Sequence, residues 1–262
     1  MIRRHRPQGI VPLEVWDVVV DGRPVYLVEG VAVPRAIADV VALLRAGQAV
    51  RHRGHRLPAL PIAHVVVGGG GGVADVVAAI AARGIDAVGL RVPVAIGLRG
   101  GRALAREVLG VVDNVLVVDV GQTSVKWFFN DRGGRVLRPA QATIEVEARL
   151  NGTLDIARAA AVEFIGAAIS SSFMNMKKPD SLVLALPCEI DDDLAVAGCS
   201  YAWPAGDPDV IVDVLARAGL SDVPAVVIND AELAAVSVQE AGALPGTLVL
   251  TIGMGLGGAF IA

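Results

Sequence analysis

The chain has 262 residues, of which 54 % are hydrophobic and only 4 % aromatic, and its formal net charge is −4 at pH 7. Its core must therefore be built from Val, Ala, Leu and Ile, which suits buried strands covered by helices of small residues. The negative charge gives no indication of nucleic acid as a partner. The two cysteines, Cys188 and Cys199, fit neither a metal site nor a disulfide framework, so we expect a reducing, cytoplasmic compartment.

Neither end of the chain predicts a membrane segment. The basic start is followed by a stretch without an unbroken apolar run, so we expect no signal peptide. The uncharged stretch 241–262 is long enough to consider as an anchor, but it contains six glycines and a proline and has no basic flank. We therefore expect no membrane partner.

Strands and helices alternate through the first 110 residues. The pattern predicts a hairpin over 14–30 around Asp21 and Gly22, a helix over 34–47, a strand running into five glycines over 64–72, a helix over 73–84, a strand over 86–92 and a helix over 100–109. The helix over 73–84 is apolar nearly all round, so we expect it to be buried.

From residue 114 onward the order is clearer. The pattern predicts a strand over 114–121, a hairpin over 126–139 with 131–134 in its turn, a strand over 141–148, a helix over 153–176, a strand over 181–188, a helix near 208–219, a strand over 223–230 and a helix over 231–242. A meander followed by two crossover units predicts an α/β fold, a mixed sheet with helices on its faces.

Three glycine turns, each at the end of a predicted strand, favour a nucleotide ligand. In "VVDVGQTSVKWF", Asp119 ends a strand, Gly121 allows a tight turn and Thr123 offers a hydroxyl. A turn of this kind points backbone N–H groups at phosphate oxygens, and a carboxylate at its mouth can hold Mg²⁺ through water. The other two turns are "IGMGLGGAF" near the end of the chain and "VVVGGGGGVAD" over 65–75.

These motifs resemble the superfamily of actins, Hsp70 chaperones and sugar kinases. "VVDVGQTSVK" is similar to its first phosphate motif, with Lys126 on the following strand. The segment from "VPAVVINDAELAA" to the terminal glycine hairpin resembles ROK-type sugar kinases most, and "HVVVGGGGG" resembles the superfamily's adenosine motif. The resemblance implies two RNase H-like (actin-like ATPase) domains of mixed sheet, with Mg·ATP in the cleft between them.

The order of these motifs differs from that of the family. The adenosine motif comes first here, followed by "RVPVAIGLRGGRALA", which resembles the segment that closes the family's second domain. The second phosphate motif comes last, so the chain resembles a circularly permuted member. We expect one domain over 113–246 and the other over 1–112 together with 247–262. The strand at 247–253 should then share a sheet with a strand from 15–28. The alternative is that the first 110 residues form an unrelated domain and that the chain is cut after the second phosphate loop.

The resemblance also implies a role for each site residue. Asp230 would be the catalytic base, Asn229 would bind a hydroxyl of the acceptor, and Asp119 would hold Mg²⁺. The nucleotide would be bound by Gly121, Gln122, Thr123, Lys126, Gly253, Gly255, Gly69, Gly70 and Gly71. Two structural alternatives stay open: the pair Asn229–Asp230 also suits a helix N-cap, and Lys126 also suits a solvated lysine.

Two functions from different classes are compatible with these motifs. The first is an ATP-dependent kinase that phosphorylates a hydroxyl of a sugar or a sugar-like small molecule. The second is an actin-like ATPase, either filament-forming or an ATP-gated binding protein, without a small acceptor. Met254 replaces the usual Thr of the second phosphate motif, and the Glu-x-Gly-His element and zinc loop of ROK kinases are absent. The sequence leaves the oligomeric state open.

Overall fold

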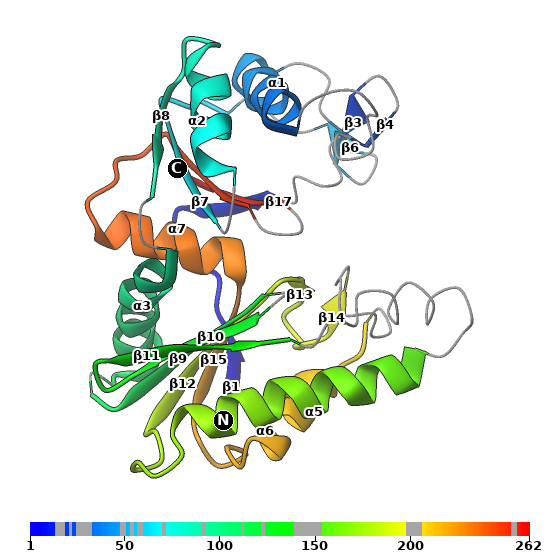
Figure 1. The fold of residues 1–262 in the computed structure, drawn as a ribbon, viewed down its shortest axis with the longest axis vertical. Coiled ribbons are helices and arrows are strands. Elements are labelled where there is room, and N and C mark those ends of the chain that lie inside the picture. The colour runs from blue at the N-terminus through cyan, green and yellow to red at the C-terminus, as the bar shows by residue number, and fades with distance from the viewer. Residues whose placement is uncertain are drawn as a thin grey trace. The chain divides into compact units, whose positions relative to one another are not determined.

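The computed structural model describes most of the chain as an α/β protein with two mixed sheets, of six and five strands, flanked by helices. The residues described are 1–13, 19–20, 23–24, 33–47, 51–52, 55–56, 60–69, 72–90, 93–111, 113–121, 124–138, 154–197, 206–252 and 256–262. The α/β class expected from the alternating pattern is thus confirmed (Figure 1).

The chain forms two compact units. Unit 1 consists of Met1–Arg6 and Gly97–Leu233, and unit 2 consists of Pro7–Ile96 and Ala234–Ala262. The expected domains assign residues 1–6, 97–112 and 234–246 to the other side of the division. Residues 1–6 belong to unit 1 because their strand pairs in parallel with a strand of the unit 1 sheet.

The unit 1 sheet has the strand order β1-β15-β12-β9-β10-β11. Its strands β1, β15, β12 and β9 are parallel, and β9, β10 and β11 form an antiparallel meander. The bounds are β1 (Ile2–Arg4), β9 (Val115–Val120), β10 (Ser124–Phe129), β11 (Arg132–Leu137), β12 (Ser181–Leu186) and β15 (Ala225–Asn229). The central strands are buried on both faces, which explains their unbroken apolar sequences.

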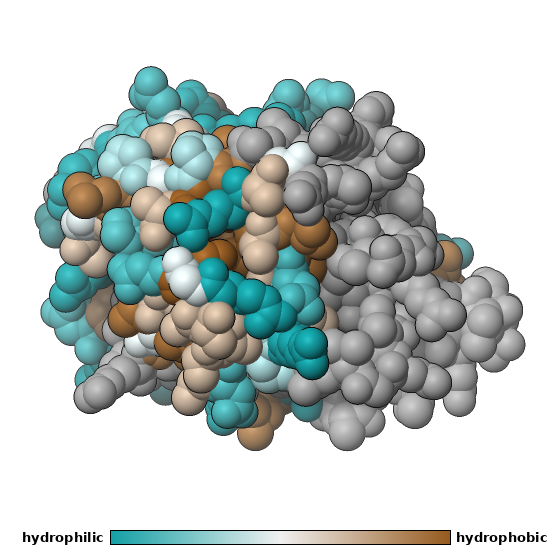
Figure 2. Space-filling model, turned by 90° about the horizontal axis from the view of Figure 1, so that it is seen from above, coloured by the Kyte–Doolittle hydropathy of each residue, from teal (hydrophilic) through white to brown (hydrophobic). Residues whose placement is uncertain are grey.

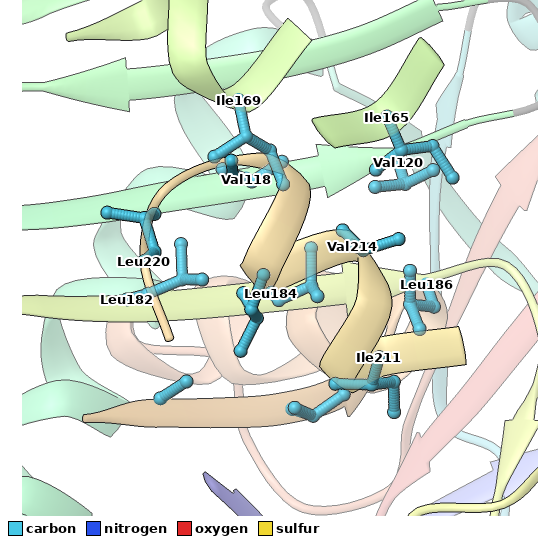
Figure 3. Close-up of a cluster of buried hydrophobic side chains, with 14 of the residues drawn as sticks. Val118, Val120, Ile165, Ile169, Leu182, Leu184, Leu186, Ile211, Val214 and Leu220 are labelled. Carbon is cyan, nitrogen blue, oxygen red and sulfur yellow. The ribbon is translucent and has the colours of Figure 1, made fainter. Parts of the chain in front are cut away.

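Helices cover both faces of this sheet. On one face α5 (Leu154–Ser172) and α6 (Val210–Arg217) pack their apolar sides against alternate residues of β9, β12 and β15 (Figures 1 and 3). Figure 3 labels this core: Val118, Val120, Ile165, Ile169, Leu182, Leu184, Leu186, Ile211, Val214 and Leu220. On the opposite face α3 (Pro93–Leu104), which continues as a π-helical turn (Ala105–Leu109), brings Gly101 onto Val117. A short hairpin, β13 (Glu189–Ile190) and β14 (Val196–Ala197), follows β12.

The unit 2 sheet has the order β2-β17-β16-β7-β8. The C-terminal hairpin of β16 (Thr247–Ile252) and β17 (Leu256–Ile261) lies inside it: β16 pairs in parallel with β7 (His64–Gly69), and β17 pairs antiparallel with β2 (Ile10–Leu13). β8 (Asp86–Gly89) is parallel to β7. The terminal hairpin is thus paired on both sides with strands that come from the first 70 residues.

The strand at 247–253 was expected to share a sheet with a strand from 15–28. The described residues of that range form β3 (Val19–Val20) and β4 (Arg23–Pro24), which pair with each other in a small separate sheet. β16 instead shares its sheet with the earlier strand β2, which pairs with β17. The hairpin around residues 21–22 is confirmed, because β3 and β4 are antiparallel neighbours across that loop.

The core of unit 2 lies between its sheet and two helices, α1 (Val33–Ala46) and α2 (Val73–Ala81). The expectation that α2 is buried was wrong. Its buried residues are Val76 and Ile80, whereas Ala74, Asp75 and Ala78 are exposed. An all-round apolar pattern made largely of alanine is therefore compatible with one solvated face. Figure 2 shows hydrophilic and hydrophobic residues interspersed over the described part of the surface that faces the viewer.

The turn between β10 and β11 also differs from the expectation of 131–134. Asn130 and Asp131 form the turn with φ of 47° and 61°, a conformation that these two residue types tolerate well. Gly134 instead lies within β11 opposite Trp127, whose ring would be 2.6 Å from a Cβ at that position. The glycine therefore makes room for the indole ring. The strand expected over 141–148 lies outside the described residues.

The remaining elements lie close to their expected positions, and α7 (Asp230–Glu240) follows β15 directly. The end of the chain is β-structure, with β16 and β17 where a membrane anchor was considered. Among the described residues, every helix is too short or too polar to cross a membrane.

The contact between α3 and β9 gives a prediction of unusual sign. In most helices Gly→Ala is stabilising by about 1 kcal/mol, but a Cβ at Gly101 would lie 2.5 Å from Cγ1 of Val117. We therefore expect Gly101→Ala to destabilise the protein by about 1–3 kcal/mol in urea unfolding. In a Val117→Ala background the same change should be neutral or stabilising. A stabilising effect of Gly101→Ala alone would contradict this packing.

Candidate functional site

The candidate site of unit 1 lies where three neighbouring parallel strands end. Near the end of β9, Asp119 pairs with Ala185 of β12, and the last residue of β15, Asn229, pairs with Leu186. Because these strands are parallel and in register, the two polar residues leave the sheet at the same edge. Asp230 follows as the first residue of α7. The carboxyl ends of parallel strands are where α/β proteins commonly bind ligands.

Asp119 is paired with a lysine from the neighbouring strand. Lys126 of β10 lies directly opposite Asp119 in the antiparallel register, and its Nζ donates to Asp119 Oδ2 at 2.7 Å. Both side chains are about a third exposed, at 30 % and 29 %. This pair therefore keeps contact with solvent, and the carboxylate is accessible to a ligand. The alternative of a purely solvated lysine does not describe Lys126, which is bonded within the site.

Asn229 acts as the N-cap of α7. Its Oδ1 accepts a hydrogen bond from the Ala231 N–H at 2.9 Å, and its Nδ2 donates to the Cys188 carbonyl at 3.0 Å. The Glu232 carboxylate reaches back to accept from the Asn229 N–H at 3.1 Å. These reciprocal bonds form a capping box, with Asn in the first position and Glu three residues later. Both the oxygen and the nitrogen of the Asn229 side-chain amide are thus hydrogen-bonded within the protein.

Asp230 has a raised pKa. The side chain is partly buried, and desolvation together with the nearby Asp119 carboxylate raises the pKa of Asp230 to about 7. Backbone N–H groups at the start of α7 and the Lys126 ammonium act in the opposite direction. Among the described residues, no cation lies within ion-pair distance of Asp230. A carboxyl group with a pKa near neutrality can accept or release a proton at physiological pH.

Sequence analysis missed two residues that support this turn. Arg4 of β1 donates from Nη2 to Glu232 Oε2 at 2.6 Å, and the two side chains are only 6 % and 1 % exposed. Arg4 also donates from Nε to the Ile190 carbonyl at 3.2 Å. The signal that could have found the pair is the Asn-x-x-Glu spacing at 229–232, which is typical of a capping box.

His5, the residue that follows β1, is also partly buried. Its backbone N–H donates to the Val227 carbonyl at 3.2 Å, which extends the pairing of β1 with β15. Burial lowers the pKa of His5 from its ordinary value, against the raising effect of the Glu107 carboxylate. Arg4, which donates to the Glu232 carboxylate, is the cation beside that group.

Gly121 makes the turn that was expected of it. Its N–H donates to the Ser124 carbonyl at 2.9 Å, which closes a tight connection between β9 and β10. A Cβ at Gly121 would lie 3.2 Å from that oxygen, so a larger residue would strain the turn. Gln122 and Thr123, which were also expected to face phosphate, lie outside the described residues.

In unit 2 the two strands that precede the other glycine motifs end side by side. Gly69, the last residue of β7, pairs with Ile252, the last residue of β16. Gly69 has φ of 147°, and a Cβ there would collide with the Ile252 carbonyl. Glycine is therefore needed for the close approach of the two strands. The expected ligand residues Gly70, Gly71, Gly253 and Gly255 lie outside the described residues.

The donor set of unit 1 suits a cation that keeps most of its water. Asp119 is partly exposed at the sheet edge, and it is close enough to Asp230 for its negative charge to raise the pKa of that residue. Among the described residues, no group of three or more His, Cys, Asp or Glu side chains could hold a metal by itself. Mg²⁺ is commonly bound in this way, by one or two carboxylates together with substrate phosphates and water. The residues present therefore fit magnesium that arrives with a nucleotide.

Comparison with known proteins gives no relative: no family model, no curated protein and no solved structure matches the chain. The geometry of the strand ends and the chemistry of their side chains are therefore the grounds on which a function can be proposed.

The raised pKa of Asp230 predicts a pH-dependent stability. Between the pKa of an unfolded Asp, about 4, and about 7, the folded state holds the proton more tightly, so stability falls as pH rises through this window. We expect Asp230→Asn to raise the free energy of unfolding at pH 8 by about 1–3 kcal/mol and to change it little near pH 4. Urea unfolding of both proteins across this range measures the difference.

The matched control for that titration is Asp119→Asn. Since the Asp119 charge raises the pKa of Asp230, removing it should move the midpoint of the pH dependence to lower pH. A wild-type protein whose stability relative to Asp230→Asn is flat from pH 4 to pH 8 would show that Asp230 is not a perturbed acid.

Proposed function

We propose that the protein is a magnesium-dependent, ATP-using phosphotransferase that acts on a hydroxyl of a sugar or sugar-like small molecule. The observation that carries this proposal is Asp230, a partly buried carboxyl group with a pKa of about 7 at the edge of a parallel sheet that also holds Asp119. A general base works best when its pKa lies near the working pH. Phosphoryl transfer to a hydroxyl needs such a base together with positioning and charge neutralisation.

Each residue of unit 1 then has a chemical task. Asp230 would accept the proton of the acceptor hydroxyl as that oxygen attacks the γ-phosphorus and the bond from this phosphorus to the departing ADP breaks. Asp119 would hold magnesium, whose charge would neutralise the phosphate oxygens. Lys126, which is 2.7 Å from Asp119, is placed to contribute a second positive charge near the phosphates. The turn at Gly121 carries the backbone toward the same edge.

Unit 2 carries the other two glycine motifs that the resemblance assigns to a nucleotide. Its two glycine turns follow β7 and β16, neighbouring parallel strands that end in register at Gly69 and Ile252. We assign the turn after β7 to adenosine and the turn after β16 to phosphate. The pairing of the C-terminal hairpin with β7 and β2 supports a permuted actin-like arrangement, because a permuted chain requires its first and last segments to share a sheet.

One observation favours the second candidate, an actin-like ATPase without a small acceptor. Asn229 was expected to bind the acceptor, but its amide is bonded to the Cys188 carbonyl and the Ala231 N–H. This residue is therefore committed to capping α7 in the described structure. Without another residue to bind a sugar hydroxyl, the same Mg·ATP site would hydrolyse ATP or hold it as a switch.

The first test of the proposal is the role of Asp119. In a calorimetric titration, wild-type protein should bind ATP with an affinity that requires Mg²⁺, and Asp119→Ala should lose most of the magnesium dependence because the carboxylate is gone. Asp131→Ala, which removes a carboxylate from the exposed β10–β11 turn, is the control for a general change of charge. Equal magnesium-dependent affinity in wild type and Asp119→Ala would remove Asp119 from the site.

The second test separates kinase from ATPase. Release of ADP should rise when the right acceptor is supplied from a panel of hexoses, amino sugars and polyols. Asp230→Asn should then retain ATP affinity and lower acceptor-dependent turnover by about 10²–10⁴-fold, since it keeps the size of the side chain and loses the base. If no acceptor raises the rate and ATP instead induces filaments visible by light scattering, the ATPase is the correct assignment.

A further inference from the structure

Three elements of the fold meet at the guanidinium group of Arg4. It belongs to β1, pairs with Glu232 in the first turn of α7 and donates to the Ile190 carbonyl in β13. Its third nitrogen donates to the carbonyl of its neighbour His5. β1 itself lies at the edge of the sheet beside β15, where Arg4 is opposite Val227. An arginine is suited to this place because its planar fork donates in several fixed directions.

The Glu232 carboxylate connects this arginine to the start of α7. Its Oε2 accepts from both Arg4 and the Asn229 N–H, while its Oε1 is buried and has no hydrogen-bond partner in the described structure. A buried carboxylate with one unsatisfied oxygen depends strongly on the one cation beside it. Stability alone is therefore a weak reason for this buried ion pair. Its second contact, from Glu232 to the Asn229 N–H, is made at the turn that carries Asp230.

We propose that Arg4 and Glu232 are positioning residues, which fix the carboxyl group of Asp230 through the capping box of α7. Arg4 holds the Glu232 carboxylate, Glu232 holds the Asn229 N–H, and Asn229 holds the Ala231 N–H on the far side of Asp230. The backbone of Asp230 is thus fixed from both neighbours. This inference rests on the proposed function for the catalytic meaning of Asp230, and on the hydrogen bonds alone for the positioning.

The N-terminal strand β1 supports the site through Arg4. Residues 2–4 add a short edge strand to the sheet, whose Ile2 packs against the unit 1 core. Its parallel direction brings Arg4, the last residue of the strand, to the same edge as Asn229. A misplacement of a reacting group by about 1 Å can lower a rate about 10²-fold, so a rigid support for Asp230 has a large effect on turnover.

Three variants separate positioning from stability. Arg4→Met leaves Glu232 buried without its cation, so it should lower the melting temperature. Arg4→Met with Glu232→Gln removes the buried charge and keeps an oxygen for the Asn229 N–H. Arg4→Met with Glu232→Met replaces the pair by apolar side chains of similar size, which commonly restores stability, but it leaves the Asn229 N–H without its acceptor. The control is Arg6→Met, which breaks an exposed pair with Asp192.

Two measurements are made on each variant: amide hydrogen exchange at Asn229 and Ala231 by NMR, and turnover with ATP and acceptor. In Arg4→Met with Glu232→Met we expect a melting temperature near wild type, exchange faster by about 5–20-fold at these two amides, and kcat lowered by about 10-fold or more with little change in KM for ATP. Arg4→Met with Glu232→Gln should recover part of the exchange protection and part of kcat, because the Gln oxygen still accepts from the Asn229 N–H but has lost the support of Arg4. Arg6→Met should match wild type in every measurement.

The outcomes distinguish this inference from the proposed function. If the apolar double variant regains wild-type stability together with wild-type exchange and kcat, the pair is only structural and the inference is overturned. If wild-type protein binds no Mg·ATP while exchange at Asn229 and Ala231 follows the expected pattern, the positioning role stands and the proposed function fails.

Discussion

The parallel pairing of β9, β12 and β15 is the constraint on which the rest of unit 1 depends. These strands are buried on both faces, so their register is fixed by the packing of α5 and α6 on one side and α3 on the other. In that register Asp119 and Asn229 flank the end of β12. A slip of one residue would turn Asp119 into the core and Val118 or Val120 out of it. The apolar packing thus determines where the two carboxylates of the site lie.

The raised pKa of Asp230 is the energetic consequence of this placement. Burial of the Asp230 carboxylate, and after it the nearby Asp119 charge, costs free energy whenever Asp230 is ionised, and the Lys126 ammonium offsets only part of that cost. Such a cost is characteristic of functional sites, where stability is exchanged for a group of useful acidity. The capping box and the Arg4–Glu232 pair hold the turn in place in spite of this local repulsion.

Much of the fold could be predicted because, for most helices and strands, the spacing of apolar residues and the turn residues at the ends indicate the same element. The helices at 33–46 and 210–217 and the strands at 115–120 and 181–186 lie within a few residues of their expected positions. Long-range pairing was harder, since β2 and the 15–28 range have similar apolar sequences and only the register with β17 selects between them. The glycines at 133–134 suggested a turn, whereas both lie within β11 and Gly134 makes room for the Trp127 ring. For the site, spacing led to Asp119, Lys126 and Asp230 but could not reveal Arg4, which reaches Glu232 across 228 positions of sequence.

The most direct test of the account is a crystal structure of the protein grown with magnesium and a non-hydrolysable ATP analogue. The account predicts a magnesium ion beside Asp119, with the γ-phosphate between it and Asp230. Strong density for the nucleotide at any other surface, with Lys126 still bonded to Asp119 and the strand ends of unit 1 empty, would contradict it.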